Sequence, residues 1–251
     1  MRIPLIVGNW KMHTTPVEAA ALTRELVAKV PARHQMEIVI APPYTSLAAT
    51  AAALQGSRLK LAAQDLHWED VGAFTGAISH LMLEAVGCTH VLVGHSERRI
   101  YFGETDHRVN QKLRAALRGG LAPILCIGEE LVERETGRLH EVLIRQLDRA
   151  LDEVSPGSAD RLSVAYEPVW AIGTGHSATV EDAAQASHLI RRQLEQLWGA
   201  AAGDKVRILY GGSVTAGNAA GFAAHQAVDG VLVGGASLKA VDFAAIAAAG
   251  W

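Results

Sequence analysis

The stretch Leu5–Leu26, LIVGNWKMHTTPVEAAALTREL, contains the pattern from which the fold can be inferred. It begins with a short apolar run, Leu5–Val7, and continues through polar residues into Val17–Leu26, where apolar residues recur at steps of three and four. A short apolar run is typical of a buried strand, whereas the three- and four-residue spacing is typical of an amphipathic helix. The stretch is therefore interpreted as one strand followed by one helix.

The same alternation recurs along the whole chain, with neighbouring apolar runs roughly thirty residues apart, the size of one strand–helix unit. Helical spacing is also found in Val109–Leu117, Leu139–Leu151 and Ala183–Leu197. Strands that alternate with amphipathic helices indicate a parallel sheet covered by helices. The eight predicted strands are Leu5–Val7, Ile38–Ala41, Leu59–Ala63, Val91–Val93, Pro123–Ile127, Leu162–Ala165, Val206–Tyr210 and Val231–Val233.

Eight such units suit a closed (β/α)8 barrel, in which eight parallel strands are ringed by helices. An open, doubly wound sheet uses the same elements, and periodicity alone does not distinguish the two. No linker rich in Pro, Gly or Ser divides the chain. Because barrels of about 250 residues commonly form one domain, residues 1–251 are predicted to be a single (β/α)8 barrel domain.

The composition disfavours several classes of partner and site. The formal net charge is −3, whereas nucleic acids and acidic membranes attract basic surfaces, so neither is expected as a partner. The chain contains no run of 18 apolar residues, which is about the length needed to span a membrane. The two cysteines, Cys88 and Cys126, are too few for a disulfide scaffold and are expected to be reduced in the cytosol. Because no histidine pair has metal-ligand spacing beside a Glu, neither a metal nor a cofactor is expected.

Polar residues of chemical interest follow five of the predicted strands. In a barrel the carboxyl ends of all strands converge on one face, where barrel enzymes keep their active sites. Each residue alone is more often a solvated charge or a structural residue, and only their joint placement predicts one shared cleft. The segments are Gly8-Asn9-Trp10-Lys11, Gly94-His95-Ser96-Glu97, Tyr166-Glu167-Pro168, Gly211-Gly212-Ser213 and Gly234-Gly235-Ala236-Ser237.

The residue types in this predicted cleft suit acid–base chemistry on a carbonyl compound. Glu167 is a candidate general base, with its backbone restricted by the following proline. His95 would lie near a helix N-terminus, where the helix dipole disfavours imidazolium and a neutral ring is expected. Lys11 and Asn9 can supply a cation and an amide donor to a developing oxyanion.

The glycines after the last two strands suit phosphate binding, because glycine allows close approach of the backbone to a ligand. Two tight turns would also explain these glycines, although not the hydroxyl of Ser213. Residues 168–175 form an apolar loop with a glycine-rich tip, which is useful if the loop folds over a ligand and excludes water. A packed surface loop is the alternative interpretation.

Together these segments resemble the triosephosphate isomerase family. The resemblance runs from residue 8 to about 239 in the order of the family's motifs, and it implies a TIM barrel. It also implies an isomerase, without metal or cofactor, that interconverts D-glyceraldehyde 3-phosphate and dihydroxyacetone phosphate in glycolysis and gluconeogenesis. The motifs that carry it are Gly8–Lys11, Gly94–Glu104, Ala165–Gly175, Tyr210–Ser213 and Val233–Leu238.

The resemblance implies a role for each site residue in a reaction through an enediol(ate). Glu167 would remove the carbon-bound proton, neutral His95 would polarise the carbonyl, and Lys11 with Asn9 would stabilise the negative charge. Ser96 and Glu97 would support this catalytic set. The residues implied to bind the phosphate of the triose are Gly173, Ser213, Gly234 and Gly235.

The resemblance further implies a cytoplasmic homodimer. The segment Gly72–Gly76, with Thr75 near its tip, matches the family's loop that inserts into the neighbouring subunit. Asp65 stands where the family usually has Asn, and Ala77 where it usually has Glu, so the interface is expected to differ. His176-Ser177 replaces the usual end of the lid, which affects the expected lid kinetics.

Two other functions use part of the same pattern. The first alternative is a different phosphate-binding barrel enzyme, such as an aldolase or a biosynthetic ketose isomerase. This hypothesis explains the glycine loops, but it does not predict the combination of Asn9, Lys11, His95 and Glu167. The hypothesis of a non-catalytic barrel that acts as a binding protein or scaffold does not explain Glu167. A carboxylate near a bound phosphate dianion is electrostatically unfavourable unless it takes part in catalysis.

Overall fold

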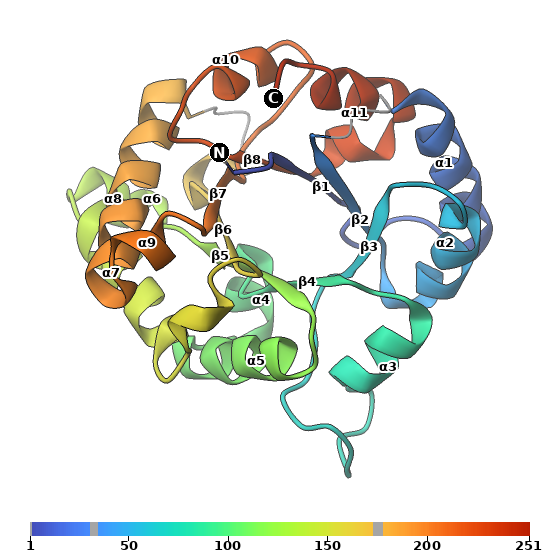
Figure 1. Cartoon of the computed structure of the whole chain (residues 1–251), viewed down its shortest axis with the longest axis horizontal. Helices are drawn as coiled ribbons and strands as arrows, with labels where there is room; N and C mark the ends of the chain where they lie inside the picture. Colours follow the sequence, from blue (N-terminus) through green and yellow to red (C-terminus); the bar gives the residue numbers. More distant parts are fainter. Residues whose placement is uncertain (1, 31–34, 173–177) are drawn as a thin grey trace.

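The computed structural model describes residues 2–30, 35–172 and 178–251. Within these ranges, eight parallel strands close into a barrel in which each strand pairs with its neighbours in chain order. This arrangement, seen end on in Figure 1, confirms the predicted (β/α)8 barrel and excludes the open sheet. The strands are β1 (Leu5–Asn9), β2 (Glu37–Ala41), β3 (Lys60–Ala63), β4 (His90–Val93), β5 (Ala122–Ile127), β6 (Ser163–Tyr166), β7 (Arg207–Tyr210) and β8 (Gly230–Val233).

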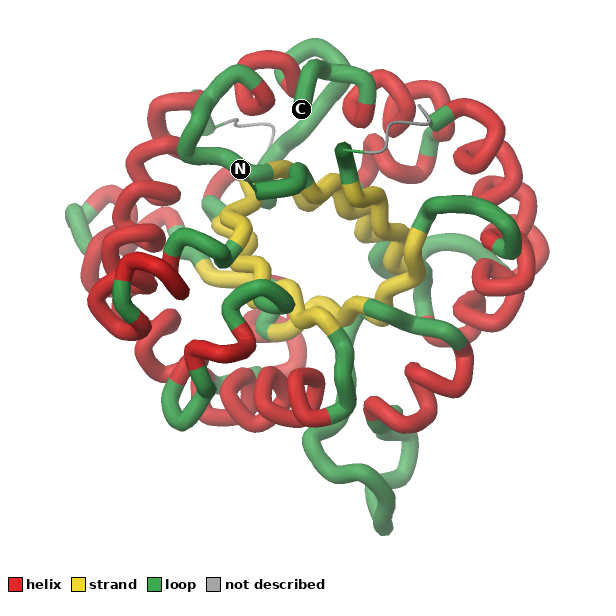
Figure 2. The backbone as a smooth tube through the Cα atoms, in the orientation of Figure 1, coloured by secondary structure: helices red, strands yellow, loops and turns green. Residues whose placement is uncertain are grey.

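Helices surround the ring of strands, as Figure 2 shows. The helix α7 shows why such segments pack there, since its buried residues recur at steps of one and three and form one apolar face. The helices in the described ranges are α1 (Pro16–Lys29), α2 (Leu47–Leu54), α3 (His80–Val86), α4 (Ser96–Phe102), α5 (Asp106–Arg118), α6 (Leu131–Glu135), α7 (Leu139–Leu151), α8 (Val180–Trp198), α9 (Ala200–Gly203), α10 (Ala219–Ala223) and α11 (Ala240–Ala247).

The alternation of side chains along each strand divides the apolar residues between two cores. In β1, Leu5 and Val7 belong to the cluster inside the barrel, together with Leu92 and Leu209. Ile6 points the other way and joins the larger cluster between strands and helices. Because both faces of each strand are buried, the strands read as continuous apolar runs in the sequence.

Local signals in the sequence explain where the helices begin. Thr15 caps α1, its hydroxyl accepting a hydrogen bond from the N–H of Glu18, and the side chain of Glu18 accepts one from the N–H of Thr15. The same reciprocal cap joins Thr179 and Asp182 at the start of α8. Such caps satisfy N–H groups that have no partner within the helix.

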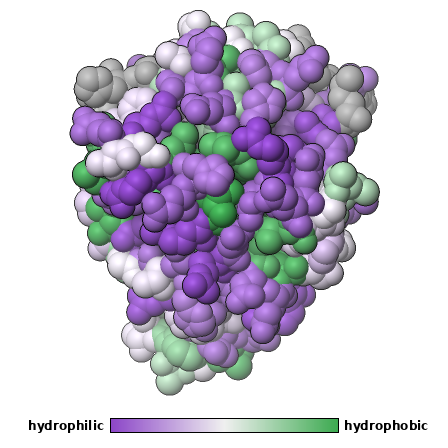
Figure 3. Space-filling view, turned by 90° about the vertical axis from the view of Figure 1, so that its left-hand side faces the viewer, coloured by the Kyte–Doolittle hydropathy of each residue, from purple (hydrophilic) through white to green (hydrophobic). Residues whose placement is uncertain are grey.

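The loop between β3 and α3, residues 64–79, projects away from the ring of helices (Figures 1 and 2). The face around α7, α8 and α9 that Figure 3 shows is mostly hydrophilic, with some hydrophobic patches. In the described ranges, no helix combines the length and the apolar character needed to cross a membrane.

Candidate active site

A cavity of about 310 Å³ opens at the carboxyl ends of the strands. It brings together residues that are more than two hundred positions apart in the sequence, as the barrel requires. Apolar side chains of Ile172 and Leu232 form part of its wall. Seven residues predicted from the sequence line it: Asn9, Lys11, His95, Glu167, Ser213, Gly234 and Gly235.

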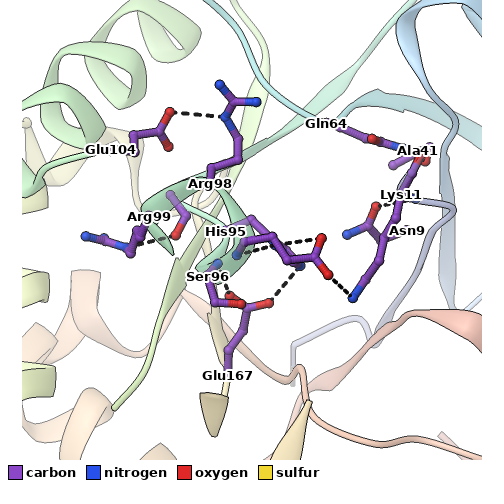
Figure 4. A network of polar contacts seen from close by, with 12 residues as sticks. Asn9, Lys11, Ala41, Gln64, His95, Ser96, Arg98, Arg99, Glu104 and Glu167 are labelled. Carbon is purple, nitrogen blue, oxygen red and sulfur yellow. Dashed lines mark hydrogen bonds and ion pairs between the residues drawn. The ribbon is translucent and has the colours of Figure 1, made fainter. Parts of the chain in front are cut away.

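The backbone of Lys11 adopts a left-handed conformation, with φ of 53°, that is uncommon for a residue other than glycine. Two side chains stabilise it. The Oδ1 atom of Asn9 accepts a 3.0 Å hydrogen bond from the N–H of Lys11. The amide of Gln64 donates to the carbonyl oxygens of Lys11 (2.9 Å) and Ala41 (2.8 Å) (Figure 4). Gln64 is therefore a site residue that the sequence pattern did not reveal.

The Lys11 side chain reaches across the cleft to α4. Its Nζ lies 2.7 Å from Oε1 of Glu97, and both side chains are partly exposed. Lys11 is the only lysine or arginine among the described residues that line the cavity. Glu97 is therefore the ion-pair partner of the one cationic side chain found among those described residues.

His95 lies between the end of β4 and the start of α4, where it caps the helix. Its Nδ1 accepts a 3.2 Å hydrogen bond from the backbone N–H of Glu97. A ring nitrogen that accepts a hydrogen bond carries no proton, so this contact leaves Nε2 as the nitrogen that can donate a proton. Nε2 lies 3.0 Å from Oε1 of Glu167 and faces the cleft (Figure 4).

Glu167 follows β6 and is almost fully buried. Its Oε2 accepts a 2.9 Å hydrogen bond from the backbone N–H of Ser96, the first residue of α4. Ser96, predicted as a supporting residue, thus contacts Glu167 directly through its backbone.

The backbone of Glu167 lies against Gly128, another residue that the sequence pattern did not reveal. A Cβ atom on Gly128 would lie 1.7 Å from the carbonyl oxygen of Glu167, so only glycine fits. The side chain of Gln146, on α7, accepts from the N–H of Gly128 (2.8 Å) and donates to its carbonyl oxygen (3.1 Å). Gly128 is therefore fixed from the opposite side by a helix of the outer ring.

Glu129 binds the first residues of the predicted lid. Its Oε1 accepts hydrogen bonds from the hydroxyl of Tyr166 (3.0 Å) and the indole N–H of Trp170 (2.8 Å), and its carbonyl oxygen accepts one from Val169. Burial raises the pKa of the Glu129 carboxyl, and these donors act against that rise. The remaining lid residue singled out from the sequence, Gly173, and the hinge His176-Ser177 lie outside the described residues.

The glycine end of the cavity leaves room for a ligand. Nothing lies within 4 Å of a Cβ atom placed on Gly235, and a Cβ on Gly234 would only touch the end of the Lys11 side chain. Gly235 begins a short 3-10 helix, Gly235–Leu238, whose first N–H groups have no partner within the helix. N–H groups at a helix start are in general suitable donors to a phosphate.

Asp65, which departs from the family pattern, is neutralised within this chain. Its Oδ1 lies 2.6 Å from Nζ of Lys112 and its Oδ2 lies 2.8 Å from Nη2 of Arg98. Burial raises the pKa of the Asp65 carboxyl, while Lys112 and Arg98 lower it. Glu104 contacts the same two cations, so the four groups form one partly buried ion cluster.

Two other predicted features lie apart from the cavity. Thr75 is exposed on the projecting loop and does not line the cavity of its own chain. Cys88 and Cys126 are both buried and unpaired, and burial raises the pKa of both thiols. Among the described residues, no group of three or more His, Cys, Asp or Glu side chains is placed to hold a metal ion.

Known proteins resemble this chain over its whole length. The family model described as triosephosphate isomerase matches residues 4–250. A triosephosphate isomerase from Moorella thermoacetica is 52% identical over 246 residues, covering 98% of each chain. One from Citrifermentans bemidjiense is 51% identical over 246 residues, with the same coverage. A crystal structure of triosephosphate isomerase from Bartonella henselae superimposes with a TM-score of 0.89 at 39% identity and covers 98% of each chain. The chain therefore belongs to the triosephosphate isomerase family, whose known reaction is the interconversion of D-glyceraldehyde 3-phosphate and dihydroxyacetone phosphate in glycolysis.

Proposed function

We propose that this chain performs the family's isomerisation with Glu167 as the base and neutral His95 as the electrophile. The observation that carries the proposal is the meeting of Glu167, His95 and Lys11 around one small cavity. A base, a neutral proton donor and a cation are the groups needed to move a proton next to a carbonyl and to stabilise the resulting negative charge.

The first step transfers a proton from carbon to Glu167. In the described arrangement the carboxylate is bound to the N–H of Ser96, so it must leave this partner when it turns toward the substrate. As the C–H bond breaks, its electron pair forms the carbon–carbon double bond of an enediolate, and the carbonyl oxygen becomes negatively charged. The N–H at Nε2 of His95 donates to that oxygen, and Lys11 and Asn9 stabilise the charge.

The second step returns the proton to the neighbouring carbon. His95 moves protons between the two oxygens of the enediol(ate), and Glu167 delivers its proton to the carbon that previously carried the carbonyl oxygen. No atom is gained or lost, which is consistent with an isomerase that needs no metal or cofactor. The neutral ring suits this exchange, because imidazole can both donate and accept a proton. A Glu base paired with a neutral His is the known arrangement of triosephosphate isomerases, and the two roles are carried over from the family to this chain.

The phosphate of the triose is proposed to bind at the glycine end of the cavity. Ser213, Gly234 and Gly235 line this end, and Gly173, outside the described residues, stays a predicted fourth contact. The lid predicted at residues 168–175 would close over this end and exclude water from the enediolate. Glu129 supports this proposal, since it binds Trp170 at the first part of the lid.

We also propose a homodimer in which the loop of residues 64–79 contacts the partner subunit. Large apolar side chains are exposed on this loop at Val71 and Phe74, and on α4 at Tyr101 and Phe102. Exposed apolar groups gathered on neighbouring elements are typical of a protein–protein interface. In this dimer, the exposed Thr75 would lie against the partner's cleft.

The remaining proposals concern the whole chain. The elements from β1 to α11 surround one barrel, which supports the prediction that residues 1–251 form a single domain. A cytoplasmic location is supported by the two buried, unpaired cysteines and by the family's place in glycolysis.

The direct test is the rate at which the purified protein converts glyceraldehyde 3-phosphate into dihydroxyacetone phosphate without added metal. We expect a kcat/KM approaching the diffusional ceiling, about 10⁸ M⁻¹s⁻¹, and a loss of most activity in Glu167→Ala. A folded protein that fails to turn over this substrate would contradict the proposed activity. Full activity in Glu167→Ala would contradict only the assignment of the base.

A further inference from the structure

The amino-terminal mouth of the barrel, opposite the catalytic cleft, is lined by charged side chains. Along each strand, alternate residues face the barrel interior. Val39, Ala62, Leu92 and Leu209 belong to the apolar interior cluster, so the residues two positions before them face the same way. Those residues, which form the first layer of the barrel, are Glu37, Lys60, His90 and Arg207.

This layer contains more positive than negative charge. Glu37 is its single carboxylate, and it forms ion pairs with both Lys60 and Arg207. Burial acts to raise the pKa of the Glu37 carboxyl, but interactions with His90, Lys60 and Arg207 lower it to about 2. Burial, helped by Arg207 and Lys60 and opposed by the attraction of Glu37, lowers the pKa of His90 to about 4. Near neutral pH the layer therefore carries two cations, one carboxylate and a neutral imidazole.

A cavity of about 650 Å³ lies over this layer. Only two carboxylates, Glu37 and Asp160, are among the described residues that line it. Asp204 and Asp229 pair with Arg2 at its edge, and Arg191 shares Asp229. A local excess of positive charge thus remains in a chain whose formal net charge is −3. The cationic residues that line the cavity are Arg2, Arg58, Lys60, Arg161, Lys205 and Arg207.

One cation at the mouth has capacity for a further partner. Lys205, exposed in the turn before β7, forms no ion pair with any described residue. An excess of cations attracts anions into a concave surface.

We propose that this mouth is a second ligand site, which binds a small anion carrying two or more phosphate groups. Lysine and arginine side chains bind phosphate oxygens through charge-assisted hydrogen bonds. The cations come from different strands and loops around the opening, so a single phosphate could reach only some of them. The cavity is about twice the volume of the catalytic cavity, 650 against 310 Å³, which favours an anion larger than a triose phosphate.

The test is a calorimetric titration of sodium tripolyphosphate into the protein at low ionic strength. The catalytic cleft is first saturated with a phosphate-bearing mimic of the enediolate, so that it cannot contribute. We expect one tripolyphosphate to bind per chain. The double variant Lys60→Gln/Lys205→Gln should weaken binding about tenfold, because two cation–anion contacts are lost. Arg207 still pairs with Glu37 in this variant, so the strands keep that contact.

A matched control separates a specific site from the general effect of charge. Arg24→Gln/Lys29→Gln removes the same charge from exposed positions on α1 and should leave the affinity unchanged. Asp160→Asn removes a carboxylate from the cavity and should strengthen binding. No binding to the mimic-saturated protein would overturn the proposal, as would equal weakening in both double variants. The readout is binding and not turnover, so these outcomes leave the proposed catalytic activity unaffected.

Discussion

The Oε2 atom of Glu167 accepts a 2.9 Å hydrogen bond from the backbone N–H of Ser96. The two residues are 71 positions apart, and the barrel brings the end of β6 to the start of α4. This contact gives the buried carboxyl a hydrogen-bond partner, without which its burial would be costly. If Glu167 is the base, as proposed, it must leave this partner before it can reach the substrate.

Shortening the base tests this arrangement. In Glu167→Asp, the carboxylate is withdrawn by about 1 Å, and we expect a fall in kcat on the order of a hundredfold with folding intact. Steady-state kinetics measure the fall, and circular dichroism checks the fold. A variant with an unchanged rate would remove Glu167 from the role of base.

Removing the Gln64 amide tests whether it positions Lys11. Gln64→Met keeps a similar volume but leaves the carbonyl oxygens of Lys11 and Ala41 without this donor. We expect a loss of stability of about 1–3 kcal/mol and a fall in kcat/KM of about tenfold, since misplaced catalytic groups lose rate steeply. Gln55→Met, at an exposed position, is the control. If activity stays normal while stability falls, Gln64 has a structural role alone.

Adding one methyl group to Gly128 tests the backbone that carries the base. Its Cβ would lie 1.7 Å from the carbonyl oxygen of Glu167, and Gln146 prevents Gly128 from moving away. Gly128→Ala should therefore displace Glu167, lowering stability by about 1–3 kcal/mol and reducing kcat. Gly157→Ala, where the nearest atom is an ordinary 3.4 Å away, should change neither quantity. Equal behaviour of the two variants would show that the backbone near Glu167 adapts.

His90 should make stability depend on pH. The pKa of His90 is about 4 in the folded chain, against an ordinary value of 6.5 that applies to the unfolded chain. Between these two pH values the unfolded chain therefore binds more protons than the folded chain. Stability must then rise with pH, and we expect about 2 kcal/mol more at pH 7 than at pH 5 from this group. Urea unfolding of the parent and His90→Gln at both pH values measures the difference, which should shrink in the variant. Exposed His107 supplies the control, His107→Gln, and an identical pH dependence in all three proteins would refute the assignment.

The proposed dimer predicts a linked loss of assembly and activity. Thr75→Arg places a large charge at the exposed tip of the projecting loop. We expect the dimer to weaken and kcat/KM to fall together, because a charge buried without a partner opposes association. Sedimentation velocity and kinetics at matched concentrations check this. A fully active monomer would show that the loop is not needed by a partner's cleft.

The strands and their chemistry could be read from the sequence because both signals are local. Each predicted strand begins and ends within two residues of the observed one, since apolar runs and the turns between them are encoded by neighbouring residues. Polar residues at strand ends, such as Lys11, His95 and Glu167, could be identified for the same reason. The closed barrel was favoured over the open sheet but could not be established, because closure requires β1 to pair with β8, more than two hundred residues away.

Local sequence patterns do not predict contacts between residues that are distant in the chain. Gln64 contacts Lys11, which is 53 positions away, and Gly128 lies against Glu167, 39 positions later. Neither role can therefore be recognised from the residues next to Gln64 or Gly128 in the sequence. The excess of positive charge at the amino-terminal mouth likewise arises only when the first residues of separate strands meet in one layer. The sequence by itself determined the elements and their order and supplied the candidate reactive groups, because these depend on composition and spacing. Only the tertiary structure decided which groups share a cavity and which side chains hold them, because hydrogen bonds and ion pairs depend on distances that barrel closure sets.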